Sequence, residues 1–231
     1  MATKAKYLKF GVVNVQSARN KTIEINELIK EKGIDILIMT ETWLHKDRSD
    51  DSKINEMVPT THEFINEPRE QRGGGVGIII SRQFKYITKI ERQTYKSFEH
   101  IEIKTRSMPT NKMFRIIAFY RNQNVNINVF LEEFGNYLNL LTNEDCQNLL
   151  LCGDFNIQIN DRRNRSVDQF ENILEEHNMS NIVTEATTRH GNILDLVICN
   201  NENKNNIRIW VEPESFLTSI HKLITFTWQI K

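Results

Sequence analysis

Apolar residues occur along the chain in short runs, and several segments between these runs have apolar positions at helical spacing. The first run, LKFGVVNV at residues 8–15, is typical of a strand. A predicted helix follows and ends near Gly33, a residue type that is common just after a helix C-terminus. The run IDILIM at residues 34–39 is the next predicted strand. The chain therefore begins with a predicted strand–helix–strand unit.

The same alternation continues to the C-terminus. Further strands are predicted at residues 76–81, 84–90, 98–104, 113–120, 149–152, 194–199, 207–211 and 223–228. Helices are predicted around residues 130–141 and 170–174. This series predicts an α/β fold, a four-layered sandwich of two mixed sheets packed face to face with helices outside. No repeat or linker divides the chain, so we expect a single domain over residues 1–231.

Two segments between the predicted strands have no strand or helix pattern. Residues 45–72 are predicted to be irregular and are followed by three consecutive glycines at residues 73–75. The glycines predict a turn with unusual backbone dihedrals. A phosphate-binding loop is the alternative, although no Gly-Lys-Ser/Thr sequence follows them. The asparagine-rich stretch at residues 200–206 is predicted to be a solvated hairpin.

The composition excludes some functions. Thirty Lys and Arg balance thirty Asp and Glu, so the formal net charge is zero. A protein that holds nucleic acid by bulk positive charge needs a basic excess, so any nucleic-acid binding must be local. No apolar run approaches the roughly 20 residues that span a bilayer, and the N-terminal sequence lacks a signal-peptide pattern. We therefore expect neither membrane association nor secretion.

Acidic and amide side chains stand within or directly after the predicted buried strands. Glu41 follows IDILIMT, and Asp154 follows LLLCG. A buried polar group without a partner costs about 1–3 kcal/mol, so groups at converging strand ends must satisfy one another. The residues that we expect to converge are Asn14, Glu41, Asp154, Asn156, Asp195 and His221.

Three carboxylates in one cleft need a compensating charge. Glu41, Asp154 and Asp195 would repel one another unless one takes up a proton or a divalent cation neutralises them. Oxygen donors, one histidine and no nearby thiolate favour Mg²⁺, or Mn²⁺, over zinc. Such a site suits hydrolysis of a phosphodiester, in which an aspartate activates water and a histidine hydrogen-bonds a phosphate oxygen.

An ordered series of motifs covers almost the whole chain. The motifs are NVQS at residues 14–17, ETWL at 41–44, GGGV at 73–76, FYR at 119–121, GDFN at 153–156, LDL at 194–196 and Ser-x-His at 219–221. In this order they resemble the apurinic/apyrimidinic-endonuclease-like domain of LINE-type, non-LTR retrotransposons, within the exonuclease III and DNase I-like phosphodiesterase superfamily. The resemblance implies a DNase I-like fold and a domain excised from a longer retrotransposon protein.

The resemblance also implies which residues bind the metal and the phosphate. Glu41 would be the main metal ligand, and Asn14 would assist it in the shell of the metal and the phosphate. Tyr120 would contact the scissile phosphate. The cofactor implied by this set is Mg²⁺ or Mn²⁺.

The remaining residues of the predicted cluster would activate water and stabilise charge. The resemblance implies that Asp154 orients and activates the attacking water, with support from Asn156. Asp195 would hydrogen-bond His221, which fixes the tautomer of the imidazole and favours its cationic form beside the phosphate.

Several residues near the predicted cleft are candidate DNA contacts. Thr188 and Arg189 match a segment that faces the DNA in the family, and Ser219 of the Ser-x-His motif is grouped with them. The resemblance also makes residues 200–206 a candidate DNA-contacting loop, as the alternative to a plain hairpin. The loop DRRNR beyond GDFN is either an ordinary solvated loop or a phosphate-binding one, with Arg162, Arg163 and Arg165 as its contacts.

One position departs from the family pattern. The family closes with Ser-Asp-His, whereas here Ile220 stands between Ser219 and His221. An acid that assists metal binding is therefore replaced by an aliphatic side chain, and Glu214 lies too far upstream to substitute for it. We expect impaired nicking, with the fold, the pair of Asp195 and His221, and DNA binding retained.

Together these features predict a Mg²⁺-dependent endonuclease that nicks one strand of double-stranded DNA during retrotransposition. The nick would leave a 3′ hydroxyl for target-primed reverse transcription by a reverse transcriptase domain of the same polyprotein. We expect the isolated domain to be a monomer, made in the cytoplasm and acting in the nucleus. A DNA-binding module with a weakened site is one alternative. A lipid or inositol phosphodiesterase is another, and the ETWL and GGGV motifs argue against it.

Overall fold

The computed structural model describes residues 7–67, 73–89, 95–106, 113–142 and 148–229. Within these residues the strands form two mixed six-stranded sheets, ordered β11-β12-β1-β2-β4-β3 and β5-β6-β7-β8-β10-β9. The strands of the first sheet are β1 Tyr7–Asn14, β2 Ile36–Thr40, β3 His62–Glu67, β4 Val76–Ser81, β11 Ile207–Ser215 and β12 Lys222–Gln229. Those of the second are β5 Tyr86–Lys89, β6 Phe98–Arg106, β7 Met113–Arg121, β8 Leu149–Asp154, β9 Met179–Asn181 and β10 Asp195–Asn200.

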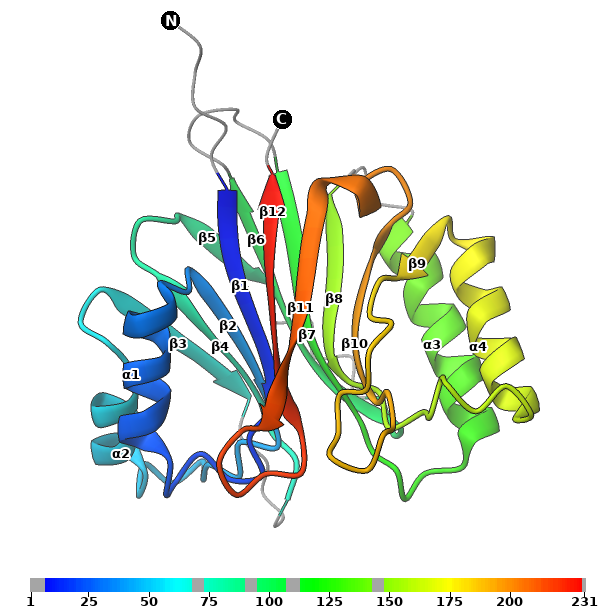
Figure 1. Cartoon of the computed structure of the whole chain (residues 1–231). Helices are drawn as coiled ribbons and strands as arrows, with labels where there is room; N and C mark the ends of the chain where they lie inside the picture. The colour runs from blue at the N-terminus through cyan, green and yellow to red at the C-terminus, as the bar shows by residue number, and fades with distance from the viewer. Residues whose placement is uncertain (1–6, 68–72, 90–94, 107–112, 143–147, 230–231) are drawn as a thin grey trace, which may run out of the picture.

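Helices cover the outer faces of the two sheets (Figure 1). The helices α1, Thr22–Lys32, and α2, Asp51–Met57, lie beside the first sheet, and α3, Ile127–Thr142, and α4, Arg165–Glu176, lie beside the second. This order of helices, sheet, sheet and helices confirms the predicted four-layered α/β sandwich. No helix in the described ranges has both the length and the apolar character needed to cross a membrane.

The main hydrophobic core lies between the two sheets. Phe10 of β1 stacks on Phe226 of β12 with ring centroids 4.6 Å apart. Trp228 of β12 meets Phe114 of β7 edge-on, with centroids 4.9 Å apart, and so joins the two sheets. All four side chains are buried. Because protein interiors are close-packed, this core fixes the strand ends of one sheet against those of the other.

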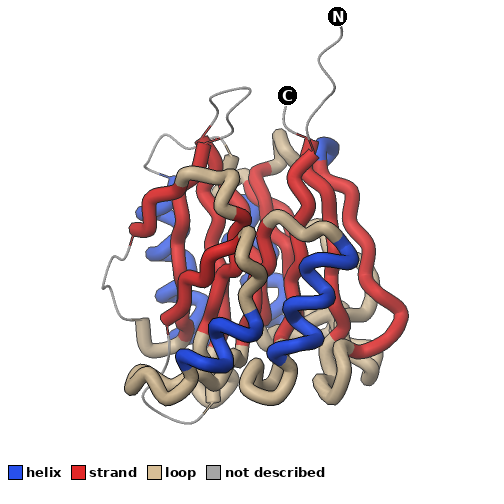
Figure 2. Tube along the Cα trace, turned by 90° about the vertical axis from the view of Figure 1, so that its left-hand side faces the viewer, coloured by secondary structure: helices blue, strands red, loops and turns tan. Residues whose placement is uncertain are grey.

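Parallel pairing brings the polar ends of several strands to one edge of the sandwich. β1 runs parallel to β2, pairing Asn14 with Thr40, and β7 runs parallel to β8, pairing Tyr120 with Asp154. β10 runs antiparallel to β8 and begins at the same edge, where Asp195 pairs with Asp154. Figures 1 and 2 show this edge at the end of the sandwich away from the two termini, where many connecting loops gather.

Three short elements are not predicted by the sequence pattern. Within residues 45–72, predicted to be irregular, the structure has α2, which buries only Met57, and β3, which is half-exposed at the edge of the first sheet. β9 is a three-residue edge strand of the second sheet. Each of these elements buries at most one side chain, and so it shows no hydrophobic periodicity.

The predicted hairpin at residues 200–206 is wrong. β10 and β11 belong to different sheets, and the segment between them crosses over through a turn and a short 3₁₀ helix, Lys204–Asn206. β10 runs from Asp195 to Asn200, so about 17 Å of strand separates this segment from Asp195 at roughly 3.3 Å per residue. Its position at the opposite end of the sandwich does not support DNA contact beside Asp195.

Candidate active site

The structure brings the predicted catalytic residues together at the polar edge of the two sheets. Each lies at the end of a strand or within two residues of one, where the buried backbone holds it in place. They are Asn14 at the end of β1, Glu41 after β2, Tyr120 near the end of β7, Asp154 at the end of β8, Asn156 just beyond it, Asp195 at the start of β10 and His221 before β12.

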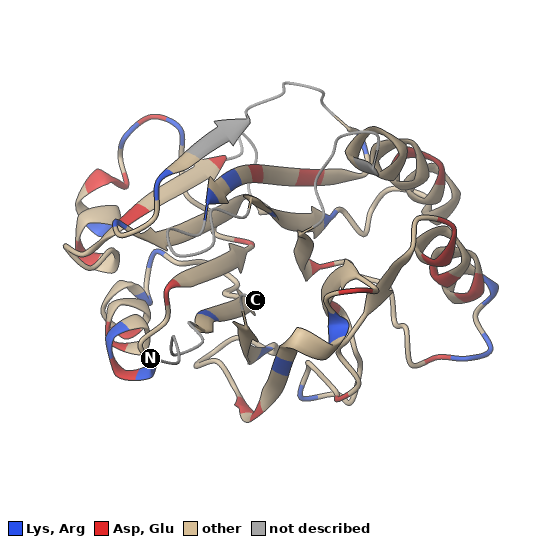
Figure 3. Ribbon diagram, turned by 90° about the horizontal axis from the view of Figure 1, so that it is seen from above, with Lys and Arg blue, Asp and Glu red and all other residues tan. Residues whose placement is uncertain are grey.

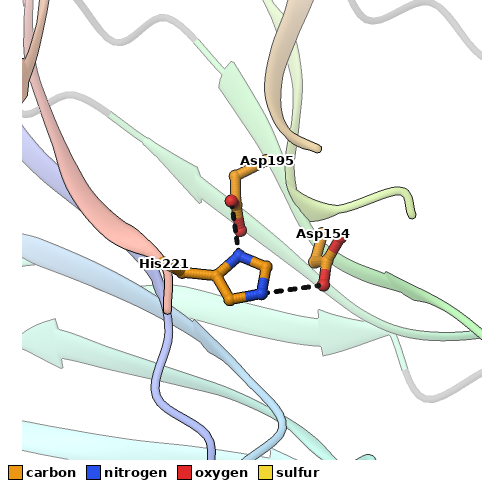
Figure 4. A group of neighbouring side chains, drawn as sticks. All are labelled: Asp154, Asp195 and His221. Atoms are coloured by element: carbon orange, nitrogen blue, oxygen red, sulfur yellow. Dashed lines mark hydrogen bonds and ion pairs between the residues drawn. The ribbon is translucent and has the colours of Figure 1, made fainter. Parts of the chain in front are cut away.

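The imidazole of His221 lies between two buried carboxylates (Figure 4). Its Nδ1 is 2.7 Å from Oδ2 of Asp195, and its Nε2 is 3.9 Å from Oδ2 of Asp154. Burial disfavours the charged imidazolium, but the carboxylates of Asp195 and Asp154 outweigh this effect and raise the pKa of His221 to about 9. The side chain is therefore cationic at neutral pH.

The pKa of Asp154 is raised as well, which here favours the neutral form of the side chain. Its carboxyl is fully buried, and burial together with the charge of Asp195 raises the pKa of Asp154 to about 7, although His221 and Asn14 favour its ionised form. A carboxylate with this pKa can accept a proton near neutral pH. The two shifts fit the predicted roles of a cationic histidine and a water-activating aspartate, which stay predictions.

Asn14 links Asp154 to Glu41. Its Nδ2 donates to Oε1 of Glu41 at 2.9 Å and to Oδ2 of Asp154 at 2.8 Å. Its Oδ1 accepts a hydrogen bond from the backbone N–H of Gln16 at 3.1 Å. As placed, Asn14 orients the two carboxylates through its nitrogen, and its part in the shell of the metal and the phosphate stays a prediction.

The triple glycine holds the turn that carries Glu41. The N–H groups of Thr42 and Trp43 donate to the carbonyls of Gly75 and Gly74, each at 3.2 Å. Glu41 itself has a positive φ of 51°, and a Cβ on Gly75, where φ is 85°, would lie 2.6 Å from Oγ1 of Thr42. The predicted glycine turn is confirmed. The phosphate-binding alternative is not supported, because the N–H of Gly75 donates to Glu99 at 2.7 Å.

Tyr120 faces the same group of carboxylates. Burial, followed by the charges of Glu41 and Asp154, raises the pKa of Tyr120 far above its usual range. The phenol therefore keeps its proton at any physiological pH and can act as a hydrogen-bond donor to an anion. This property fits the predicted contact with a phosphate, which stays a prediction.

Arg121, in the FYR motif, fixes Asn156. Its Nη1 donates to the carbonyl of Asn156 at 3.0 Å, and Nδ2 of Asn156 donates back to the carbonyl of Arg121 at 2.8 Å. The N–H of Asn156 donates to Oδ1 of Asp154 at 2.9 Å, and Asn156 has a positive φ of 49°. Sequence reasoning assigned no role to Arg121, although its place beside Tyr120 in the motif was the available signal.

Gly153, the first residue of GDFN, is required by close packing of strands. Its φ is 146°, and a Cβ there would lie 1.9 Å from the carbonyl oxygen of Phe119 on β7. Only glycine avoids this clash with backbone. The motif therefore begins with a packing requirement that sets the position of Asp154.

Thr187 is a positioning residue that sequence reasoning missed. Its Oγ1 accepts hydrogen bonds from the N–H groups of Leu194 and Asp195, at 3.0 and 3.1 Å. Its carbonyl accepts from the N–H of Lys222 at 2.7 Å, next to His221. One threonine thus ties the start of β10 to the start of β12, the two elements that carry the buried ion pair. A threonine in a loop gives no sequence signal of such distant backbone partners.

Two of the predicted DNA contacts are buried inside the protein. Ser219 and Thr188 are each 1% exposed. Oγ of Ser219 donates to the carbonyl of Asn14 at 2.7 Å and accepts from the N–H of His221 at 3.1 Å, whereas the hydroxyl of Thr188 exchanges hydrogen bonds with the backbone of Asn192. Direct DNA contact by either side chain is therefore the wrong prediction. Ser219 instead links the backbones of Asn14 and His221, and Thr188 pairs with His221 in an isolated β-bridge.

The predicted arginine contacts are exposed but not equivalent. Nη1 of Arg162 lies 2.7 Å from both carboxylate oxygens of Glu171, so its charge is already paired. The side chain of Arg163 is 97% exposed, and its contact with a carboxylate oxygen of Asp161 is longer, at 3.7 Å. Arg165 and Arg189 are also exposed. Basic and acidic residues are interspersed around the described ribbon (Figure 3). A role of these arginines in DNA binding stays a prediction.

Ile220 is held by its backbone at the rim of the site. Its N–H donates to Oε1 of Gln16 at 3.0 Å, and its carbonyl accepts from the N–H of Arg189 at 3.0 Å. The side chain is half-buried. The pair of Asp195 and His221 forms despite the aliphatic residue between Ser219 and His221.

The donor set fits a hard divalent cation. The ligand atoms of Asp154, Asp195 and His221 lie within 4.8 Å of one another, and Glu41 is linked to Asp154 through Asn14. Burial, followed by the charge of Asp195, raises the pKa of Asp154 despite the nearby His221, so a bound cation would favour its ionised form. Carboxylate oxygens without a thiolate among the described neighbours suit Mg²⁺ or Mn²⁺. Glu41, the least buried of these acids, remains the predicted main ligand.

A known protein family matches the part of the chain that holds most of this site. The model of the family described as endonuclease-reverse transcriptase matches residues 114–225, which include Tyr120, Asp154, Asp195 and His221. No curated protein matches the sequence.

Solved structures share the fold over nearly the whole chain at low sequence identity. The endonuclease domain of TRAS1, a telomere-specific non-LTR retrotransposon, has a TM-score of 0.76 and 13% identity, covering 97% of this chain and 99% of that one. The AP endonuclease of Leishmania major has a TM-score of 0.79 and 13% identity, covering 98% and 89%. A 3′ phosphatase from Neisseria, bound to a product DNA hairpin, has a TM-score of 0.70 and 15% identity, covering 96% and 100%.

The predicted DNase I-like fold is therefore confirmed. The predicted resemblance is confirmed as well: the chain matches the endonuclease-reverse transcriptase family over residues 114–225, on a fold that it shares with AP endonucleases and with the endonuclease domain of a non-LTR retrotransposon.

Proposed function

We propose that this protein is a divalent-metal-dependent endonuclease that nicks one strand of double-stranded DNA. The observation that carries the proposal is the buried arrangement of Asp195, His221 and Asp154, with Asn14 joining Asp154 to Glu41. This arrangement places one cationic donor and one proton acceptor side by side, which is what hydrolysis of a phosphodiester requires.

The two perturbed pKa values support the roles that we propose for the central pair. His221 stays protonated up to about pH 9, so it cannot act as the general base at neutral pH. Asp154, with a pKa of about 7, can. Asp195 accepts from Nδ1 of His221 and leaves Nε2 to donate toward the phosphate.

In the proposed chemical step, a water molecule attacks the phosphorus atom of the scissile phosphate. Asp154 accepts a proton from water as the water oxygen bonds to phosphorus, and the bond between phosphorus and O3′ breaks. The products are a 5′ phosphate and a 3′ hydroxyl, whose oxygen takes up a proton from solvent water as it leaves, and Asp154 later returns its proton to solvent. His221 and the phenol of Tyr120 donate hydrogen bonds to phosphate oxygens on which negative charge increases.

Glu41 would hold the cation, with Asn14 and the glycine turn keeping its carboxylate in place. When bound, Mg²⁺ or Mn²⁺ neutralises charge on the phosphate and stabilises the leaving oxygen.

We propose further that the 3′ hydroxyl primes a reverse transcriptase domain of the same polyprotein in the nucleus. The match to the endonuclease-reverse transcriptase family and the likeness to the TRAS1 endonuclease domain support this context.

A second candidate function is a DNA-binding module with a weakened catalytic site. Ile220 favours it, because the family pattern has an acid there that assists metal binding, and no charge replaces it at this position. The two candidates predict the same fold and differ in the rate of hydrolysis.

Nicking of supercoiled plasmid by the wild type and by Ile220→Asp separates these functions. For an impaired nuclease we expect slow Mg²⁺-dependent nicking by the wild type and at least about tenfold faster nicking by Ile220→Asp, a gain of about 1.4 kcal/mol in transition-state stabilisation. The nicks should be extended by a DNA polymerase, which reports the 3′ hydroxyl. Equal and fast rates for both proteins would contradict a weakened site, and plasmid binding without nicking by either would favour the binding module.

A further inference from the structure

The loop between β11 and β12 exposes a leucine in a strained conformation. Leu217 is 48% exposed and has a φ of 51°, in the left-handed region that leucine rarely adopts. Among the large exposed hydrophobic residues of the described chain, which are Tyr7, Ile23, Val129, Leu140, Trp210 and Leu217, it alone has a positive φ. Strained residues persist where the surrounding structure holds them, and they concentrate at functional sites.

The loop is anchored on both sides of this leucine. The N–H of Phe216 donates to the carbonyl of His221 at 2.7 Å, and the N–H of Ser219 donates to the carbonyl of Phe216 at 3.0 Å. Oγ of Ser219 is bonded to the carbonyl of Asn14, and Phe216 packs against the core beneath α1. The tip at Leu217 is therefore presented outward by a turn that is tied directly to the catalytic residues.

The surroundings of the loop combine an apolar tip with positive charge. The N–H of Arg189 donates to the carbonyl of Ile220 at 3.0 Å, so the exposed Arg189 stands beside the same loop. Proteins that kink DNA pair basic side chains on the phosphates with aliphatic side chains that enter between stacked bases. A leucine held rigidly beside an arginine has the chemistry of such a wedge.

We propose that Leu217 inserts between stacked bases of the target duplex beside the nick, so that the enzyme selects steps that unstack easily. This inference rests on the proposed function, because its ligand is duplex DNA. Leu217 and His221 are four positions apart in the chain, so their Cα atoms are at most about 14 Å apart at roughly 3.6 Å per residue. With about 3.4 Å per base-pair step, the unstacked step lies within about four steps of the nick. The favoured targets are flexible pyrimidine–purine steps such as TA and CA.

The structure offers sharp variants for testing this wedge. Leu217→Ala removes the side chain, and Leu217→Asn removes it while placing there a residue that tolerates positive φ. Leu140→Ala is the matched control, because Leu140 is 49% exposed and lies on α3. Relief of strain in Leu217→Asn should raise the Tm by about 2–4 °C, so loss of the wedge in that variant cannot be ascribed to unfolding.

The first readout is the fluorescence of 2-aminopurine at a TA step in a short duplex, with chelator present so that no strand is cut. We expect the wild type and Leu140→Ala to raise the fluorescence on binding, and both variants of Leu217 to lose most of this rise. The second readout is the map of nicks with Mg²⁺. In Leu217→Ala the preference for nicking at TA and CA steps should fall about tenfold. A mismatch that unstacks the step in advance should reduce the difference in nicking rate between this variant and the wild type.

The two readouts together distinguish the wedge at Leu217 from the proposed nuclease activity. Fluorescence and nick maps of Leu217→Ala that match the wild type would overturn the wedge. A wild type that nicks without unstacking would overturn the wedge and retain the nuclease. Unstacking by the wild type without nicking would support the wedge and contradict the proposed nuclease, and a wild type that does neither would contradict both.

Discussion

At the scale of single residues, His221 is the side chain whose state sets the chemistry of the site. Its Nδ1 contacts Asp195 at 2.7 Å, and its Nε2 lies 3.9 Å from Asp154. Two buried carboxylates on one imidazole keep it cationic, which leaves Asp154 as the group that can accept a proton from water.

We expect the imidazole of His221, followed by NMR in the metal-free protein, to titrate near pH 9. In Asp195→Asn the midpoint should fall toward the ordinary value, about 6.5, because the first carboxylate partner is lost. Asp168→Asn, which removes an exposed acid from α4, is the control and should leave the midpoint in place. A midpoint that Asp195→Asn leaves near 9 would contradict the assigned ion pair.

The same shift makes stability depend on pH in a defined direction. Because the folded-state pKa of His221 is raised above the unfolded value, the stabilisation is fully present below about pH 6.5 and is lost as the pH rises through about 9. Urea unfolding of the wild type should show this loss between those limits, and His221→Asn should show a smaller one.

The catalytic residues could be predicted from sequence because polar types such as Glu41 and Asp154 are conspicuous directly after apolar strands. Their supports could not be predicted. Arg121 and Thr187 act through backbone groups that are distant along the chain, and Ser219 and Thr188 are buried although their motifs favour DNA contact. Burial and hydrogen-bond direction depend on how the two sheets meet, which no local pattern records.

At the scale of elements, the turn after β2 and the triple glycine act as one unit. The carbonyls of Gly74 and Gly75 accept from Trp43 and Thr42, and this pairing holds Glu41 at a positive φ. Long buried strands such as β2 and β4 were predictable from their apolar runs, whereas α2, β3 and β9 were not, because each buries too few side chains to show a period.

Gly75→Ala should displace Glu41 and destabilise the fold. A Cβ there meets Oγ1 of Thr42 at 2.6 Å, and φ is 85°. We expect a loss of about 1–3 kcal/mol in urea unfolding, together with weaker Mn²⁺ binding. Gly135→Ala is the matched control, because nothing lies within 4 Å of its Cβ and it is inside α3. That change should stabilise the protein by about 0.5–1 kcal/mol.

The loop that leads into α4 offers a graded test of DNA binding. Arg163 is almost fully exposed, while Arg162 is paired with Glu171. If Arg163 contacts a phosphate, Arg163→Ala should reduce the slope of log affinity against log salt by about 1, and Arg162→Ala should reduce it less. Arg208→Ala on the edge strand β11 is the control. A slope that stays unchanged even when Arg162, Arg163 and Arg165 are all replaced by Ala would remove this loop from the DNA interface.

At the scale of the whole molecule, two six-stranded sheets bring residues from six strands to one edge. The zero net charge is compatible with DNA binding, because the acids of the site offset basic residues on the surrounding loops. A divalent cation at Glu41 would therefore form part of the surface that binds the phosphate. The proposed hydrolysis needs that cation and Asp154 to act together.

The rate of plasmid nicking by the wild type and by Asp154→Asn, with Mg²⁺ and with chelator, tests this claim most directly. We predict that the wild type converts supercoiled plasmid to open circles only with Mg²⁺, and that Asp154→Asn lowers the rate by at least about 100-fold, the lower range for loss of a general base. Nicking that persists in chelator, or an Asp154→Asn variant that nicks as fast as the wild type, would contradict the account.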